Sequence, residues 1–213
     1  MSFEQIKKKV DDYYTQKIRT YGPTAKGVDW KSPESQLLRF EQLAKLIEER
    51  EGFSVIDFGC GYGALADFLM ERKKDFRYLG YDISKEMVSI ARKIHSSKKH
   101  LRFTTDFSLL KKSDYVIASG IFNVKLDNDD RAWQEYIIQT LGEMASLAKK
   151  GFAFNVLTSY SDPEYRRRDL HYADPLMLFD HCKKKFSRFV ALLHDYPLYE
   201  FTILVRYLEE LSG

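Results

Sequence analysis

The stretch Val55-Ile56-Asp57-Phe58-Gly59-Cys60-Gly61-Tyr62-Gly63-Ala64 decides the fold of this chain, because a short apolar strand runs directly into a glycine-rich turn that opens a helix. Glycines suit such a turn, since the backbone must turn tightly and approach a ligand without a Cβ atom in the way. About 20 residues further on, a second apolar strand ends in Asp82. An acid at that place in a nucleotide-binding sheet accepts hydrogen bonds from both hydroxyls of a ribose. The two strands therefore predict an α/β sheet with a nucleoside site at its edge.

The glycine spacing by itself leaves two kinds of ligand open, because Gly59, Gly61 and Ala64 also satisfy the dinucleotide pattern G-x-G-x-x-G/A. Asp57 distinguishes between them. A carboxylate two residues before the first glycine repels a pyrophosphate at the helix N-terminus. The same carboxylate suits a ligand that ends in an amino acid with an ammonium group, as S-adenosylmethionine does. We therefore expect S-adenosylmethionine as the cofactor, with Gly63 giving room for the backbone beside its methionine portion.

From Phe53 onward, short apolar strands alternate with amphipathic helices, a pattern typical of crossover units that build a mostly parallel sheet. The link between the last two predicted strands, His194-Asp195-Tyr196-Pro197, permits only a hairpin, so the sheet should finish with an antiparallel edge. Strands are expected at 53–58, 77–81, 101–104, 114–119, 151–158, 187–194 and 199–207, and helices at about 3–18, 33–51, 64–73, 85–95, 129–149 and 174–185.

In this combination the sequence resembles the class I S-adenosylmethionine-dependent methyltransferases, of the bacterial small-molecule type, over roughly residues 35–207. The stretch from Asp57 to Gly63 is similar to the first motif of that family. Tyr81-Asp82-Ile83-Ser84 is similar to its ribose-binding acid, followed by a helix cap. The resemblance implies an α/β, Rossmann-like fold with a mostly parallel sheet of seven strands in the order 3-2-1-4-5-7-6, closed by a C-terminal antiparallel hairpin.

The resemblance also implies which residues hold the cofactor. Thr105-Asp106-Phe107 follows the third predicted strand, where this family commonly places an acid near the adenine amino group and an apolar side chain against the ring. Cys60 is interpreted as a small spacer within the glycine motif rather than as a nucleophile. The residues expected to bind the cofactor are Asp57, Gly59, Cys60, Gly61, Gly63, Asp82, Ile83, Met87, Asp106, Phe107, Ser119 and Tyr14.

Residues 1–34 are expected to form an N-terminal helix and loop that act as a lid, ahead of a methyltransferase domain at 35–213. Aromatic rings that face a sulfonium can stabilise it through cation–π attraction while they exclude water. The alternative is that the tyrosines of the helix are the end of an amphipathic stripe that packs on the domain, and both can hold at once. The rings of this segment are Tyr13, Tyr14, Tyr21 and Trp30.

The methyl acceptor should lie beyond the carboxyl ends of the fourth and fifth strands. Family members that methylate an exocyclic or amide nitrogen usually carry Asp or Asn there, followed by Pro-Pro and an aromatic residue. This chain has Ser119-Gly120-Ile121-Phe122-Asn123 instead, which disfavours methylation of adenine or of glutamine side chains. We expect a small-molecule acceptor, methylated at oxygen rather than nitrogen. An alcohol needs a base, and His171 and His194 are the candidates, since each follows a predicted strand. Arg39 is a candidate partner for the methionine carboxylate of the cofactor or for an anionic acceptor, although an arginine on the surface is the commoner outcome.

Composition narrows the partners. The 213 residues carry 34 Lys and Arg against 31 Asp and Glu, a net charge of +3 that is too balanced to indicate a dedicated polyanion-binding protein, so we expect no nucleic-acid partner. The N-terminus lacks an apolar signal region and no stretch has the length of a membrane span, so a cytoplasmic location without membrane contact is expected. Cys60 and Cys182 are too few for a disulfide framework or a zinc site, and no metal is expected.

Three other functions stay open at this point. The first is a methyltransferase that acts on RNA or protein, which would bind that polymer in a salt-dependent way. The second is a non-catalytic protein that retains the methyltransferase fold, because a fold alone does not establish a function. A nicotinamide-dependent dehydrogenase is a more distant third, disfavoured by Asp57 and by the late position of the glycine loop.

Overall fold

A seven-stranded sheet forms the centre of the computed structural model, which describes residues 2–208. Strands β1 to β5 run parallel, whereas β7 runs antiparallel to both β5 and β6. The strand order is β3-β2-β1-β4-β5-β7-β6, which confirms the expected Rossmann-like fold and its antiparallel edge. The strands are β1 (Ser54–Phe58), β2 (Arg77–Tyr81), β3 (Leu101–Thr104), β4 (Ser113–Ala118), β5 (Ala148–Leu157), β6 (Phe189–Leu193) and β7 (Glu200–Arg206).

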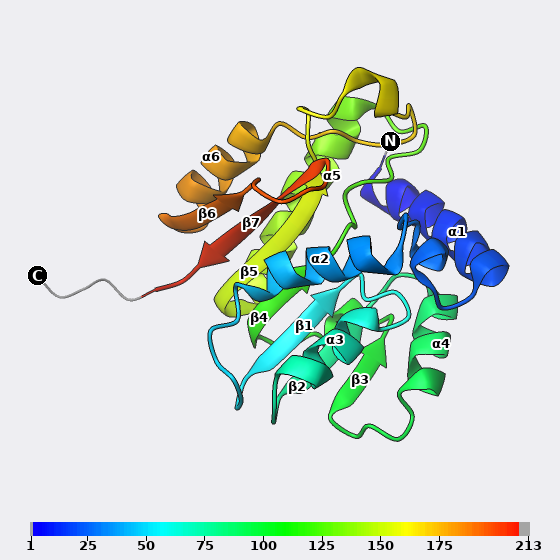
Figure 1. Ribbon diagram of the computed structural model, residues 1–213, viewed down its shortest axis with the longest axis vertical. Helices are drawn as coiled ribbons and strands as arrows, with labels where there is room; N and C mark the ends of the chain where they lie inside the picture. Colours follow the sequence, from blue (N-terminus) through cyan, green and yellow to red (C-terminus); the bar gives the residue numbers. More distant parts are fainter. Residues whose placement is uncertain (1, 209–213) are drawn as a thin grey trace, which may run out of the picture.

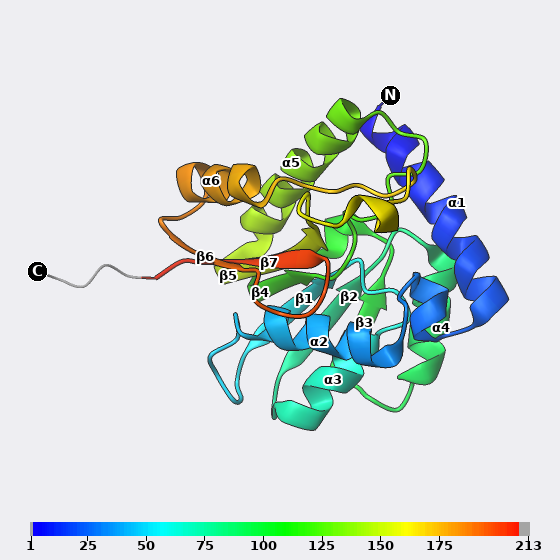
Figure 2. The same ribbon diagram turned by 45° about the horizontal axis from the view of Figure 1, so that its top comes forward.

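Helices cover both faces of the sheet (Figure 1). Figure 2 shows α2 (Pro33–Ala44) and α3 (Ala64–Arg72) below the sheet, and α5 (Asp130–Leu147) and α6 (Pro175–Lys185) above it. Helix α1 (Phe3–Tyr21) runs along the side of the molecule from the start of α5 to α4 (Lys85–Ile94). Short 3-10 helices are η1 (Ala25–Val28), η2 (Phe107–Leu109) and η3 (Pro163–Tyr165). Within residues 2–208, no helix is both long and apolar enough to cross a membrane.

Side-chain caps explain where most of the helices begin. A cap oxygen accepts a hydrogen bond from an amide in the first turn, which would otherwise have no partner. Ser2 and Gln5 form the expected capping box of α1. Helix α3 is the exception, because it begins after Gly63, which has no side chain to act as a cap. The glycine loop, rather than a capping side chain, therefore determines the conformation of the first turn of α3. The other capping residues are Ser32, Ser84, Asp129 and Asp174.

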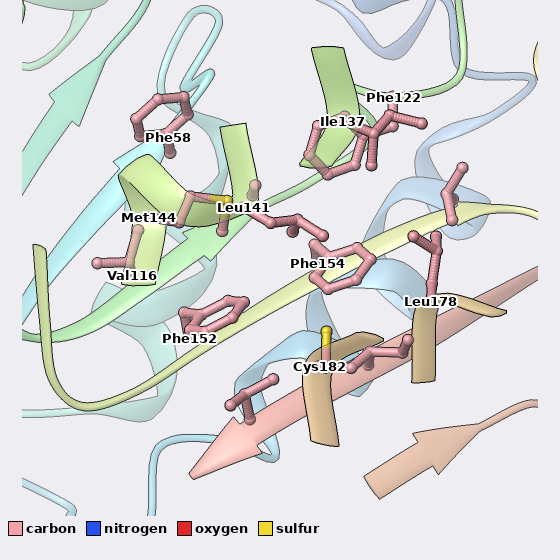
Figure 3. Packing of buried hydrophobic residues seen from close by; sticks show 14 of the residues in the cluster. Phe58, Val116, Phe122, Ile137, Leu141, Met144, Phe152, Phe154, Leu178 and Cys182 are labelled. Carbon is pink, nitrogen blue, oxygen red and sulfur yellow. The ribbon is translucent and has the colours of Figure 1, made fainter. Parts of the chain in front are cut away.

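Two apolar clusters hold the layers together, one on each face of the sheet. Figure 3 shows the cluster beneath α5 and α6, where Leu141 and Met144 of α5 pack over Phe152 and Phe154 of β5. These side chains are fully buried, because central parallel strands are covered on both faces. Cys182 of α6 lies in the same cluster, which explains why it is a free thiol rather than a site residue.

Helix α2 ends earlier than its apolar pattern predicts. The helical pattern was expected to continue to Gly52, whereas the structure ends α2 at Ala44. A tighter turn follows, in which the amides of Leu46 and Ile47 donate to carbonyls three residues back. This turn buries both side chains, at 1% and 4% exposure, in the cluster below the sheet. The prediction of a helix as far as Gly52 is therefore wrong beyond Ala44, because Leu46 and Ile47 are buried by a tighter turn instead.

Candidate functional site

Two adjoining cavities lie at the carboxyl ends of β1, β2 and β4. The space between atoms, open solvent included, is about 670 Å³ in the larger cavity and about 320 Å³ in the smaller one. Both extend beneath the N-terminal segment. The larger cavity is lined by Val10, Tyr14, Val28, Trp30, Phe58, Gly59, Gly61, Tyr81, Asp82, Ile83, Met87, Ser119, Gly120, Ile121 and Tyr136. The smaller cavity is lined by Val28, Trp30, Gln36, Phe40, Asp57, Gly59, Cys60, Gly61, Tyr62, Ala64, Leu65 and Ser119.

Asp82 stands at the end of β2 on the wall of the larger cavity. Its carboxylate accepts hydrogen bonds from the amides of Gly61, at 2.8 Å, and Ser84, at 2.9 Å. These bonds tie the glycine loop to the end of β2 and orient the carboxylate. Burial raises the pKa of Asp82 to about 6, although the backbone hydrogen bonds oppose the rise. The carboxylate oxygens retain free lone pairs, so the group can accept further hydrogen bonds from a ligand in the cavity.

Asp57, the last residue but one of β1, faces the smaller cavity and is 2% exposed. The hydroxyl of Tyr78 donates to it at 2.5 Å. Burial raises the pKa of Asp57 to about 7, the hydrogen bond from Tyr78 lowers it, and the nearby Asp82 carboxylate raises it. A buried carboxyl group with a pKa near neutrality gains most from a cationic partner, so this cavity favours a ligand that brings a positive charge.

The N-terminal segment closes the site from the side opposite the sheet. Tyr14 of α1 and Trp30 line the larger cavity. The Thr15 and Ser84 hydroxyl oxygens lie 2.7 Å apart, which joins α1 to the start of α4. The loop behind α1 is fixed by Asp29, which accepts hydrogen bonds from the Tyr13 hydroxyl and the Lys17 ammonium. These contacts hold the segment that carries Tyr14 and Trp30 against the cavity.

Nine of the residues predicted to bind the cofactor line one cavity or both. Cys60 is buried and its Sγ points to the carbonyl of Gly61, at 3.6 Å. Burial raises the pKa of this thiol, so it remains protonated, as a spacer in the motif would. The nine are Tyr14, Asp57, Gly59, Cys60, Gly61, Asp82, Ile83, Met87 and Ser119.

Three predicted cofactor residues lie outside the lining. Asp106 is exposed, and its carboxylate accepts from the amide and hydroxyl of Ser108. Phe107 lies at the rim, with its ring centroid 5.8 Å from that of Tyr81. Gly63 has a positive φ of 90°, and a Cβ atom there would lie 2.7 Å from Nε2 of His95. The packing beneath the loop therefore accounts for a glycine at this position, independently of any ligand.

The two candidate bases line neither cavity. His171 donates its backbone amide to the carbonyl of Asn123, and burial lowers the pKa of its imidazole to about 4. His194 is exposed beyond the end of β6, where its ring lies beside Tyr160 and Phe201. The fold places neither imidazole in the lining of a cavity, so the catalytic role of the two histidines stays a prediction.

Arg39 is the clearest correction to the sequence analysis, in which a surface position was the commoner expectation. Its side chain is 8% exposed and forms an ion pair with Glu200, which is fully buried. The guanidinium also donates to the carbonyl of Ser35 and stacks on the Trp30 ring. The carboxylate partner of Arg39 is therefore Glu200, the first residue of β7. No local signal in either segment indicates this pairing.

Several lining residues were not predicted. Gln36 stands in the first turn of α2, where its Oε1 accepts from the Tyr62 hydroxyl at 3.2 Å. Tyr136 lines the larger cavity from α5, one position before the buried Ile137. The one sequence feature that could have indicated Gln36 as a lining residue is its position as a polar residue in the first turn of a predicted helix. Among residues 2–208, no group of three or more His, Cys, Asp or Glu side chains is arranged to hold a metal ion.

Comparison with known proteins identifies the family. The family model described as "Methyltransferase domain" matches residues 56–151. A protein of Mycobacterium tuberculosis (strain ATCC 25618 / H37Rv), named "Putative methyltransferase Rv1506c", is 47% identical over 162 residues, which are 76% of this chain and 98% of that protein.

Solved structures share the fold at low sequence identity. Magnesium protoporphyrin IX methyltransferase (ChlM) from Synechocystis PCC 6803, with bound S-adenosylhomocysteine, is 18% identical with a TM-score of 0.67, over 94% of this chain and 100% of that one. The N-methyltransferase NodS from Bradyrhizobium japonicum WM9, also with S-adenosylhomocysteine, is 14% identical with a TM-score of 0.67, over 94% and 99%. Together with the glycine loop and its acids, these matches establish that the chain belongs to the class I S-adenosylmethionine-dependent methyltransferases.

Proposed function

We propose that this enzyme transfers the methyl group of S-adenosylmethionine to an oxygen atom of a small molecule. The observation that carries the proposal is the joined pair of cavities, with Asp82 in one, Asp57 in the other and the N-terminal segment over both. The cofactor, when bound, supplies an electrophilic methyl group on a sulfonium. A concave site that the N-terminal segment partly covers suits a small acceptor better than a polymer.

The two acids divide the cofactor between them in this proposal. Asp82 accepts from the ribose hydroxyls in the larger cavity, and Asp57 pairs with the ammonium group in the smaller one. The Oγ of Ser119 supports this placement, because it is buried without a hydrogen-bond partner among the described residues and Ser119 lines both cavities. A buried hydroxyl without a partner is costly, and the polar methionine portion would satisfy it. Residues 1–34 act as the lid.

Two observations favour oxygen as the acceptor atom. The turn after β4 lacks the Asp/Asn-Pro-Pro-aromatic motif of many nitrogen methyltransferases. Asn123, the asparagine within the stretch Ser119–Asn123, already accepts from the backbone amide of Leu157 at 3.0 Å, which commits its oxygen to the fold. Likeness to the solved structures does not choose the atom, because ChlM and NodS are named for different acceptors.

The lining also restricts the chemistry of that oxygen. Apart from Asp82, the titratable groups of the larger cavity are tyrosines. Burial raises the pKa of Tyr14, Tyr81 and Tyr136, so none of them is a base at neutral pH. We therefore propose an acceptor oxygen that is already ionised in water or easily ionised, as in a carboxylic acid or a phenol. A carboxylate carries no proton at neutral pH, and a phenol would release its proton to solvent before transfer. Methyl transfer then needs an in-line approach and a dry site.

Calorimetric titration with S-adenosylhomocysteine, with NAD as a control, tests the cofactor site. A screen that measures the release of S-adenosylhomocysteine from S-adenosylmethionine then tests the acceptor, using matched sets of aromatic carboxylic acids, phenols, aliphatic alcohols and amines. Turnover of the acids or phenols alone is the expected result. Turnover of aliphatic alcohols would contradict the absence of a base, and turnover of amines would contradict the choice of oxygen. If the protein binds NAD but not S-adenosylhomocysteine, the proposed function is wrong.

A further inference from the structure

Trp30 lies at the junction of the two cavities. It lines both of them, as do Val28, Gly59, Gly61 and Ser119. The proposed function places the ribose in the larger cavity and the ammonium group in the smaller one, and the sulfur atom of the cofactor connects these two portions. Trp30 therefore borders the region in which the sulfur and its methyl group would lie, and its position bears on both binding and transfer.

The indole of Trp30 is held between a backbone and a cation. A Cβ atom on Gly120 would lie 2.2 Å from two carbons of the ring, so the ring approaches this backbone as only a glycine allows. On the ring lies the guanidinium of Arg39, whose Cζ is 3.9 Å from the ring centroid. Stacking of a guanidinium on an indole is favourable, and more so where water is excluded.

A buried polar chain connects the two groups that hold the ring. Arg39 forms its ion pair with Glu200, at 8% and 0% exposure of the two side chains. Glu200 accepts a hydrogen bond from Nδ2 of Asn155. The Oδ1 of the same Asn155 accepts from the amide of Gly120 at 2.9 Å. The contacts thus run from Trp30 through Arg39, Glu200 and Asn155 to Gly120, and from Gly120 back to Trp30.

Stability alone is a weak reason for such an arrangement. Removing two charges from water costs about as much as their attraction returns, and well-packed apolar residues often replace a buried ion pair without loss of stability. The guanidinium here has a second constraint, because its Nη1 donates to the carbonyl of Ser35 at 2.6 Å. Arg39 is therefore held in one orientation, with its plane available to the indole.

We propose that Arg39 and Glu200 are positioning residues, which hold Trp30 against Gly120 and so keep the junction of the cavities in the shape that the cofactor requires. The inference rests on the proposed placement of the cofactor. It adds a function for the start of β7 and for α2, neither of which carries a residue of the motifs that bind the cofactor.

The main test is the double variant Arg39→Met/Glu200→Gln. It removes both charges together, so no unpaired charge is left in the interior, and Gln retains an acceptor for Asn155. We expect it to fold with a thermal midpoint within a few degrees of that of the wild type, and to bind S-adenosylhomocysteine on the order of tenfold more weakly. Arg72→Met is the matched control, because Arg72 also stacks on an aromatic ring, that of Phe68, away from the cavities. This control should bind within about twofold of the wild type.

The fluorescence of Trp30 distinguishes positioning from a merely structural role of Arg39 and Glu200, because a structural role alone would leave the Trp30 emission unchanged. The difference between the spectra of the wild type and Trp30→Phe isolates the emission of Trp30 from that of Trp133. We expect this difference spectrum to shift to longer wavelength in the double-variant background, as the indole becomes exposed to water. Arg39→Lys should restore the ion pair without the planar stack, and so leave the affinity closer to that of the double variant than to that of the wild type.

The outcomes separate the two proposals. Wild-type binding of S-adenosylhomocysteine together with unchanged affinity in the folded double variant would overturn this inference and leave the proposed function intact. An unchanged Trp30 spectrum would overturn it as well. If the wild type itself does not bind S-adenosylhomocysteine, the proposed function fails and the inference fails with it. If the double variant does not fold, the pair is structural, and full affinity in the Arg39→Lys protein would then overturn the positioning role.

Discussion

The hydroxyl of Tyr78 lies 2.5 Å from the carboxylate of Asp57, on the floor of the smaller cavity. The two residues stand on neighbouring strands, because β1 and β2 pair in parallel with Val55 opposite Tyr78. A neutral donor of this kind stabilises the carboxylate without neutralising it. Asp57 is thus held in place by Tyr78, and in the proposed function its charge is available to the ammonium group of the cofactor.

Affinity for S-adenosylhomocysteine should rise with pH in the neutral range. The pKa of Asp57 is raised to about 7 in the ligand-free protein, so the carboxyl group is largely protonated at pH 6 and must lose a proton to pair with an ammonium group. One unit of pH below the pKa corresponds to about a tenfold loss of affinity. Calorimetric titrations between pH 6 and pH 7.5 measure this directly.

Asp57→Asn and Tyr78→Phe are the controls for that pH profile. The asparagine variant should bind weakly, with a shallower profile that retains only the titration of Asp82 near pH 6. The phenylalanine variant loses the hydrogen bond that lowers the pKa of Asp57, so the rise in affinity should move to higher pH. A wild-type profile as shallow as that of Asp57→Asn would contradict the assignment of Asp57 to the ammonium group.

The same group should affect the stability of the ligand-free protein in the opposite direction. The folded-state pKa of Asp57, about 7, lies above the ordinary value of 3.8, so folding favours the protonated form. This contribution to stability is fully present below about pH 3.8, is lost progressively as the pH rises towards 7, and is absent above the folded-state pKa. Asp57→Asn removes this pH dependence of stability. The unfolding midpoint of the variant should therefore rise relative to that of the wild type between pH 5 and pH 8. Urea unfolding at several pH values measures the difference.

Replacement of Asp82 by alanine should weaken S-adenosylhomocysteine binding by about 1–3 kcal/mol, because hydrogen bonds to a charged acceptor are lost. Asp106→Ala is the matched control. Its carboxylate is committed to Ser108 and lies outside the lining of the cavities, so we expect a change of less than about 0.5 kcal/mol. A larger loss of affinity for Asp106→Ala than for Asp82→Ala would contradict the assignment of Asp82 to the cofactor and would favour Asp106 in its place.

The fold was predictable because its signals are local. The strand that enters the glycine loop, the alternation of strands and helices, and the short link before β7 each depend on neighbouring residues. The end of α2 was not predictable in this way. Its apolar spacing continues past Ala44, but the choice between a helix and a tighter turn depends on the cluster that receives Leu46 and Ile47.

The candidate site was predictable only where the motif supplied it. Asp57 and Asp82 follow from their distance to the glycines, and the structure places both on the cavity walls. Arg39 and Glu200 could not be paired from sequence, because they meet only when α2 crosses the start of β7. The histidines were selected for their chemistry, and an imidazole that follows a strand is not thereby directed at the site.

Gly63→Ala should destabilise the protein by about 1–3 kcal/mol, because a side chain is strained at a positive φ and the new methyl group meets His95. Urea unfolding measures the loss. Gly142→Ala is the matched control, since it lies inside α5 with open space around it and should gain about 0.5–1 kcal/mol. Equal losses for the two variants would show that the packing against His95 does not require glycine.

Ser119→Ala separates the requirements of folding from those of binding. In the ligand-free protein the Ser119 Oγ is buried without a partner among the described residues, so its removal should leave the free energy of unfolding unchanged or raise it by up to about 1 kcal/mol. Binding should respond in the opposite direction, because the hydroxyl faces both cavities and can bond to the methionine portion of the ligand. We expect a loss of about 0.5–1.5 kcal/mol in affinity for S-adenosylhomocysteine, and a smaller rise of the thermal midpoint on saturation.

Ser161→Ala completes this comparison. The Ser161 hydroxyl donates to the carbonyl of Thr158 at 2.7 Å and lies outside both cavities. Its removal should lower the free energy of unfolding by about 0.5–1.5 kcal/mol and leave the affinity unchanged. The two serines are therefore expected to behave as opposites in the same pair of experiments. If Ser119→Ala instead follows the pattern of Ser161→Ala, the Ser119 hydroxyl belongs to the fold and the methionine portion of the cofactor must be placed elsewhere.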